Sequence, residues 1–189
     1  MKRNLGYLLL SSLVLIMFSC KSGFEHNKAG FEKMNEELIH KFGADVYYTD
    51  LELVRNIGSD EAVLVTETSN PTSLKQEQWL RYSGGEWEKQ ADVSFTAEGA
   101  DPKLFMFQLN KEVSLSKMGD LLQTSKDQLL KEKNIKEPAL IAASIKSNNK
   151  MNSKETGIFY YLTLQDPASK MGYNFVYDLK GKSMELVEK

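Results

Sequence analysis

Two stretches of the chain carry apolar residues at helical spacing. In the first stretch, Phe31, Met34, Leu38 and Phe42 recur at intervals of three or four residues. This spacing places them on one side of an α-helix, which is typical of a helix packed on a protein core. Gly43 follows directly, and glycine is common just after the end of a helix. The pattern therefore predicts a first amphipathic helix that ends before Gly43.

A second helix is predicted in the middle of the chain. Its apolar face consists of Leu115, Met118, Leu121, Leu122 and Leu129. Either Ser114 or Ser116 is suited to cap its first turn, because a serine side chain accepts a hydrogen bond from the backbone there. The helix is expected to end near Asn134, ahead of Pro138, because the residue before a proline disfavours helical geometry.

Eight further segments have the composition and alternation of β-strands. Four follow each helix, and they lie at 46–55, 61–68, 76–82, 87–95, 139–145, 158–164, 173–179 and 184–187. Between the two halves, the run 104–109 is apolar on both faces of a strand. Strands buried on both faces have this composition, so an additional central strand is predicted there, joining the halves.

The second half of the chain repeats the order of the first, a helix and then four strands. Five pairs of landmarks are offset by 93 to 96 residues: Val46 and Ala139, Val63 and Ile158, Asn70-Pro71 and Asp166-Pro167, Tyr82 and Tyr177, and Gly85 and Gly181. Turns are rich in such residues in any protein, so a single unrepeated α+β domain stays open as the alternative. The predicted fold is α+β, with two tandem units in which a helix packs on one face of a four-stranded antiparallel sheet.

The beginning of the chain has a different pattern. Lys2 and Arg3 precede an apolar run over 8–18, and Cys20, the only cysteine, follows shortly after. The run is shorter than the roughly 20 residues that a membrane-spanning helix needs, and it fits a cleaved signal peptide. The stretch resembles a bacterial lipoprotein signal peptide with its lipobox, although Met17 stands where that motif usually has leucine. A plain secretory signal and an uncleaved membrane anchor are the alternatives.

The resemblance to lipoproteins implies that Cys20 becomes the mature N-terminus and carries a diacylglycerol and usually a third acyl chain, such as palmitate. Two or more chains anchor a protein stably in a membrane. Lys21, and the absence of an acidic run after Cys20, favour a lipoprotein of the bacterial outer membrane that faces the periplasm. The predicted parts of the chain are a signal peptide (1–19), a flexible tether (20–30), a first unit (31–96), a linker with an extra strand (97–113) and a second unit (114–189).

From residue 31 to residue 188, the predicted architecture is similar to the tandem helix-plus-four-strand periplasmic modules of the beta-lactamase-inhibitor-protein type. It is less closely similar to the PepSY-like lipoproteins. The local match consists of an aromatic residue before a glycine turn, from Tyr82 to Trp87 and from Tyr177 to Met184. No functional residue is carried over from these families, so the resemblance implies a fold and not an activity.

Charge and composition give little support to nucleic-acid, metal or cofactor chemistry. Without Lys2 and Arg3, the chain has 22 basic and 26 acidic residues, a net charge near −4 that does not suggest a nucleic-acid partner. The two histidines, His26 and His40, have no further histidine or cysteine at the spacing of a metal site. We therefore expect no metal and no cofactor.

The sequence also gives little support to catalysis. It has no Gly-x-Ser-x-Gly motif, and neither histidine is placed to activate a serine nucleophile. Asp50 and Glu52 share one face of a predicted strand, but a catalytic carboxylate pair needs one buried acid, which the pattern does not indicate. The pair is interpreted as part of a solvated sheet face, and the protein is not expected to be an enzyme.

The predicted strand 76–82 and the hairpin after it carry the best candidates for a binding surface. Glu77, Trp79 and Arg81 share one face of the strand, Tyr82 lies on the other, and Trp87 follows the turn. Tryptophan, tyrosine and arginine are enriched where proteins contact their partners. These five residues are predicted to bind an envelope protein or peptide without catalysis.

Three alternatives stay open for these residues and for the protein. Trp79 and Trp87 are also suited to completing the core, in which case they bind no partner. The eight methionines would suit a carrier of a small apolar ligand held between the two repeats. The third alternative is that the protein is a hydrolase.

Overall fold

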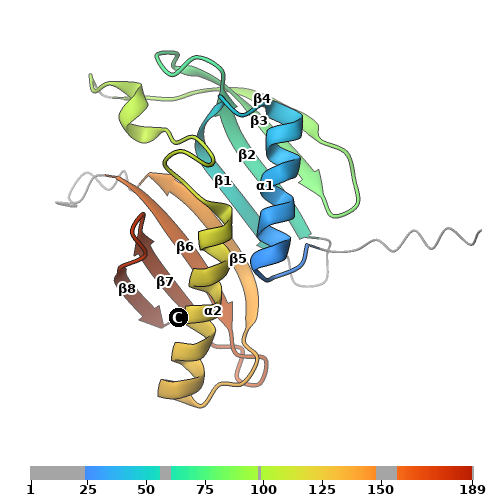
Figure 1. Cartoon of the computed structure of the whole chain (residues 1–189), viewed down its shortest axis with the longest axis vertical. Helices are drawn as coiled ribbons and strands as arrows, with labels where there is room; N and C mark the ends of the chain where they lie inside the picture. The colour runs from blue at the N-terminus through green and yellow to red at the C-terminus, as the bar shows by residue number, and fades with distance from the viewer. Residues whose placement is uncertain (1–23, 56–60, 98, 148–156, 189) are drawn as a thin grey trace, which may run out of the picture.

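The computed structural model describes residues 24–55, 61–97, 99–147 and 157–188 (Figure 1). It confirms the predicted α+β class and the predicted helices. The elements are α1 (Lys28–Phe42), β1 (Tyr47–Arg55), β2 (Glu61–Thr68), β3 (Lys75–Tyr82), β4 (Glu88–Ser94), a short 3-10 helix (Pro102–Phe105), α2 (Leu115–Lys133), β5 (Ala139–Ser147), β6 (Ile158–Gln165), β7 (Gly172–Asp178) and β8 (Ser183–Glu188).

The eight strands form one antiparallel sheet in the order β4-β3-β2-β1-β5-β6-β7-β8. Strands β1 and β5 pair at its centre, with Leu51 opposite Ile145 and Leu53 opposite Ala143. Both helices lie on the same face of this sheet, α1 over the half that contains β1 and α2 over the half that contains β5 (Figure 1). The apolar faces of both predicted helices therefore pack against one continuous core.

Capping residues fix where the helices begin and end. The Asn27 side chain accepts a hydrogen bond from the Gly30 N–H at the start of α1. Of the two serines suited to cap α2, Ser114 does so, accepting from the Lys117 N–H. Asn134 caps the end of α2 in the left-handed conformation, which confirms the predicted end of the helix near this residue. The boundaries of both helices thus follow from local hydrogen bonding.

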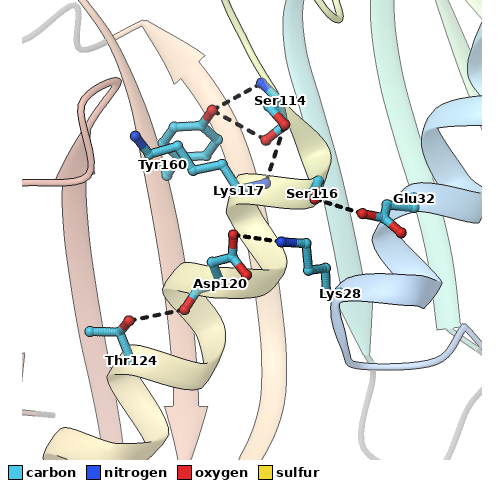
Figure 2. A network of polar contacts seen from close by, with 8 residues as sticks. All are labelled: Lys28, Glu32, Ser114, Ser116, Lys117, Asp120, Thr124 and Tyr160. Carbon is cyan, nitrogen blue, oxygen red and sulfur yellow. Dashed lines mark hydrogen bonds and ion pairs between the residues drawn. The ribbon is translucent and has the colours of Figure 1, made fainter.

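The two helices are joined by polar contacts across their exposed sides (Figure 2). The Lys28 ammonium lies 3.1 Å from the Asp120 carboxylate, and the Ser116 hydroxyl donates to Glu32 at 2.7 Å. The Tyr160 hydroxyl of β6 accepts a hydrogen bond from the Ser114 N–H, which ties the start of α2 to the sheet. These contacts fix α1 relative to α2 and hence to the sheet beneath.

The segment 104–109 is not the central strand that its composition predicted. Residues up to Phe105 form the 3-10 helix, and Leu104 is 67% exposed. Phe107 forms an isolated bridge with Tyr48, at the start of β1. The physical reason is that β5 pairs with β1 directly from Asp50 onward, which leaves only the first residues of β1 for the linker. The predicted linker strand is therefore reduced to a single bridge.

The last residues of the predicted tether, which spans 20–30, belong to the folded part of the chain. Helix α1 begins at Lys28, and the residues before it are held by Glu61 at the start of β2. The Phe24 N–H donates to one Glu61 oxygen at 3.0 Å, and the His26 Nε2 lies 2.6 Å from the other. Burial lowers the pKa of His26 in this position, although the Glu61 charge opposes the shift. Residues 24–30 thus belong to the folded domain, whereas the predicted signal peptide and Cys20 lie outside the described residues.

Candidate functional site

A groove separates α1 from the two outer strands of its half of the sheet, β3 and β4. It consists of two cavities that share Lys41 as a lining residue, and we call the two together the α1–β3 groove. One cavity, of about 810 Å³, is lined by residues that include Lys41, Phe42, Glu67, Lys75, Trp79 and Asp92. The other, of about 570 Å³, is lined by residues that include Glu37, His40, Lys41, Arg81, Glu86 and Trp87.

Aromatic rings from α1, from β3 and from the turn before β4 line the groove. The Phe42 ring meets Trp79 and Trp87 edge to face, at centroid distances of 5.7 and 5.2 Å. The Lys41 ammonium lies over the Trp79 ring, 4.6 Å from its centroid. The Arg81 guanidinium is 5.9 Å from the Trp87 centroid. Phe42, the last residue of the predicted helical stripe, therefore joins the two tryptophans instead of completing the deep core.

Four of the charged side chains that line the groove form ion pairs. Arg81 forms an ion pair with Glu37 of α1. Lys89 of β4 lies 2.7 Å from both Asp92 and Glu77, and its hydrogen bonds to these carboxylates raise the pKa of Lys89. These pairs hold the side chains of β3 and β4 in place along the groove.

Glu67 differs from these four side chains in being buried and in having no ion pair within the part of the chain that the structure describes. It is only 9% exposed, and its carboxylate accepts a hydrogen bond from the Trp79 Nε1 at 3.2 Å. Burial raises the pKa of Glu67, and the nearby Glu77 charge acts in the same direction. No lysine, arginine or histidine nitrogen of the described residues forms an ion pair with Glu67. The larger cavity thus has a buried acceptor with no ion-pair partner among the described residues, although the Lys89 charge acts on it from nearby.

The corresponding position in the other half of the sheet is closed. On β7, the side chains that face α2 are Tyr173, Phe175 and Tyr177, and all three are buried. The Tyr177 hydroxyl shares a 2.8 Å hydrogen bond with Ser125 of α2 in the core. On β3, the side chains that face α1 are polar or only partly buried. The groove is therefore a feature of the first half.

The structure brings together four of the five predicted binding residues. Glu77, Trp79 and Arg81 share the helix-facing side of β3, and Trp87 lies beside them. Tyr82 is 50% exposed and belongs to the opposite face, where it pairs with Ala62. This placement also corrects one landmark of the predicted repeat, because Tyr82 faces away from the helices and Tyr177 faces α2.

Sequence reasoning missed Lys41, Phe42 and Glu67 as parts of the site. A signal for Glu67 was present in the strand pattern. Val63, Val65 and Glu67 alternate along β2, so a carboxylate occupies a position where the alternation places core residues. Lys41 and Phe42 carry no comparable signal, because their role depends on how α1 lies across the sheet.

Asp50 and Glu52 lie on the opposite face of the sheet from the groove, beside the central strand β5. The prediction of a solvated pair is wrong for Asp50, because burial raises the pKa of Asp50 to about 6. The Glu52 charge adds to this shift, and the Lys146 charge opposes it. One Asp50 oxygen is buried without a hydrogen-bond partner among the residues described. The central pairing with β5 causes this burial, and it could not be read from strand β1 alone.

The burial of Asp50 predicts a pH dependence of stability. Its pKa in the folded state lies above the value of about 3.9 in an unfolded chain, so the folded state binds the proton more tightly. Protonation of Asp50 therefore stabilises the folded state at low pH, and this stabilisation is lost as the pH rises from about 4 to about 6. Asp50→Asn is expected to be more stable than the native chain at pH 7.5, by roughly 1–3 kcal/mol.

The measurement for Asp50 is urea unfolding of both proteins at pH 4 and pH 7.5. The difference in the free energy of unfolding between native chain and variant is expected to be larger at the higher pH. An equal difference at both values would contradict the burial of a titrating carboxylate at this position.

The described residues contain no group of three or more histidine, cysteine, aspartate or glutamate side chains placed to hold a metal ion. None of their helices has both the length and the apolar composition to cross a membrane. No protein-family model, no curated protein and no solved structure matches the chain.

Proposed function

We propose that this chain is a lipid-anchored bacterial envelope protein whose α1–β3 groove binds a peptide or an exposed segment of another protein, without catalysis. The observation that carries the proposal is the open helix-facing side of β3, which presents Trp79 and Arg81 next to Trp87. Residues of these types dominate the energetics of protein contacts when they sit in a pocket. Attachment through Cys20 would raise the local concentration of the groove for a partner at the same membrane.

The finer organisation of the fold belongs to the same proposal. We regard the chain as a duplicated unit of one helix and four strands, whose copies are joined through β1 and β5. Support comes from the matching element order and from the arrangement of the sheet order about this central pair. In this view the second copy keeps the closed core, and the first copy exchanged part of its core for a binding groove.

The position of the cavities favours peptide binding over the carriage of an apolar ligand. A carrier of the kind considered above would hold its ligand between the two halves. Both cavities of the α1–β3 groove instead lie within the first half, and their linings contain several charged side chains. Where the halves meet, α1 and α2 approach closely, since a Cβ on Gly119 of α2 would lie 2.5 Å from the Lys28 Cα.

A pair of variants on one hairpin tests the proposed binding. Trp87→Ala removes a groove side chain, and Tyr82→Ala removes an aromatic side chain of the opposite face. We expect Trp87→Ala to weaken the affinity for the partner at least about tenfold, as a hot-spot residue does. Tyr82→Ala is expected to leave the affinity unchanged.

The measurement is affinity purification of the full-length lipoprotein from detergent-treated envelopes, followed by quantification of co-purified proteins. Thermal unfolding checks that each variant keeps the native fold. A partner retained equally by the native chain and by Trp87→Ala would contradict the proposal, as would a partner lost from Tyr82→Ala alone.

A further inference from the structure

The larger cavity of the α1–β3 groove has a chemistry that selects its occupant. Its lining includes the buried Glu67 carboxylate, which has no ion-pair partner among the described residues. Tyr48, which pairs with Glu67 across β1 and β2, is buried and its hydroxyl has no hydrogen-bond partner among the described residues. A buried carboxylate without an ion-pair partner is costly, so a ligand that supplies a positive charge in contact with it gains binding energy there.

The aromatic wall of the cavity already accepts an ammonium group. Lys41 places its Nζ 4.6 Å from the centre of the Trp79 ring, within the range of a cation–π interaction. The Trp79 Nε1 donates to Glu67, so the ring face and the carboxylate belong to one connected unit. The chain's own lysine therefore shows which chemical group this wall accommodates.

The charge of the whole groove points in the same direction. Six acidic residues line the two cavities: Glu36, Glu37, Glu67, Glu77, Glu86 and Asp92. Two lysines and one arginine line them, and of these Arg81 is paired with Glu37 and Lys41 lies on Trp79. Lys89 of β4 pairs with Glu77 and Asp92, so the acids still outnumber the lysines and arginines by two. This surplus of negative charge attracts basic segments and repels acidic ones.

We infer that the α1–β3 groove binds a basic peptide segment and that a lysine of this segment pairs its ammonium with the Glu67 oxygen that does not accept from Trp79, beside the Trp79 ring. The inference rests on the proposed function and names its ligand class. Lysine fits better than arginine, because one Glu67 oxygen already accepts from Trp79 and bidentate pairing with a guanidinium needs both. A volume of about 810 Å³ accommodates several residues of a peptide and not one amine alone.

Intrinsic fluorescence makes this inference testable without a known partner. The two tryptophans of the chain, Trp79 and Trp87, both line the groove, so the emission reports on it directly. The full-length protein in a non-ionic detergent is titrated with pentalysine, with pentaglutamate and with n-butylamine. We expect pentalysine to change the emission at saturable concentrations, to bind at least tenfold more tightly than n-butylamine, and to lose affinity as salt is added.

Two variants and a control identify the residues responsible. Glu67→Gln keeps an acceptor for Trp79 and is expected to weaken pentalysine binding at least tenfold. Lys41→Gln removes the ammonium that already lies on the Trp79 ring, and it is expected to strengthen pentalysine binding severalfold. This second variant still tests the inference if Glu67→Gln fails to fold. Glu52→Gln, on the opposite face of the sheet, serves as the control and is expected to bind as the native chain does.

Each contrary outcome overturns the inference. Pentaglutamate binding as tightly as pentalysine, or equal affinities for the native chain and Glu67→Gln, would exclude a basic segment seated on Glu67. An affinity for n-butylamine equal to that for pentalysine would assign the site to a small amine. If pentalysine does not bind but Trp87→Ala still loses a partner from envelopes, the basic ligand class is wrong and the groove remains the binding site.

Discussion

Phe175→Ala is expected to lower the free energy of unfolding by about 3–5 kcal/mol, whereas Trp79→Ala is expected to lower it by about 1–2 kcal/mol. Both side chains lie on the third strand of their half and face its helix. Phe175 is 1% exposed and stacks on Tyr177, so its removal leaves a cavity in the closed core. Trp79 is only partly buried and borders an existing cavity, so its truncation enlarges a space that water already reaches.

The measurement for this pair is urea unfolding followed by far-UV circular dichroism, because Trp79→Ala removes a fluorophore. The comparison separates the binding proposal from the alternative that Trp79 completes the core. If Trp79→Ala destabilises the protein as much as Phe175→Ala, Trp79 is a core residue and the α1–β3 groove loses its main candidate for partner contact.

The periodic patterns of the sequence were sufficient to predict both helices and all eight strands of the sheet. Helix α2 illustrates why. Its apolar stripe, the cap at Ser114 and the end at Asn134 are all local features, and each acts within one helical turn of the residues that carry it. The strands are similarly bounded by local turn residues, so their ends lie within a few residues of the predicted ones.

Features that depend on pairing between distant strands could not be predicted in the same way. The composition of 104–109 suits a buried strand, but the centre of the sheet is taken by β5. Matching Tyr82 with Tyr177 by their spacing placed them in equivalent positions, yet a difference of one residue in register moves a side chain to the other face. The burial of Asp50 depends on the same central pairing.

The candidate site was predicted in part for the same reason. Glu77, Trp79 and Arg81 share a face because alternation along one strand determines it. Which element covers that face depends on where α1 crosses the sheet, and the position of α1 is in turn set by its contact with α2. The openness of the groove, and the roles of Lys41 and Glu67 in it, therefore follow from tertiary packing.

That contact between the helices gives the second large expected effect, at Gly119 of α2. A Cβ at this position would lie 2.5 Å from the Lys28 Cα and 2.9 Å from the Lys28 nitrogen, so the backbone of α1 would have to move. The shift would strain the contacts from Lys28 to Asp120 and from Ser116 to Glu32 (Figure 2). Gly119→Ala is expected to lower the free energy of unfolding by about 1–3 kcal/mol.

The sign of this effect is informative, because alanine is favoured over glycine in a helix by about 1 kcal/mol when nothing else changes. Thr124→Ala, on the exposed side of the same helix, is the matched control and is expected to stay within about 0.5 kcal/mol of the native chain. Urea unfolding monitored by circular dichroism measures both. A gain of stability in Gly119→Ala would show that the helices are not in close contact there.

Because α1 also forms one wall of the groove, a displaced α1 should change the environment of both tryptophans, and the emission of the folded Gly119→Ala protein should differ from that of Thr124→Ala.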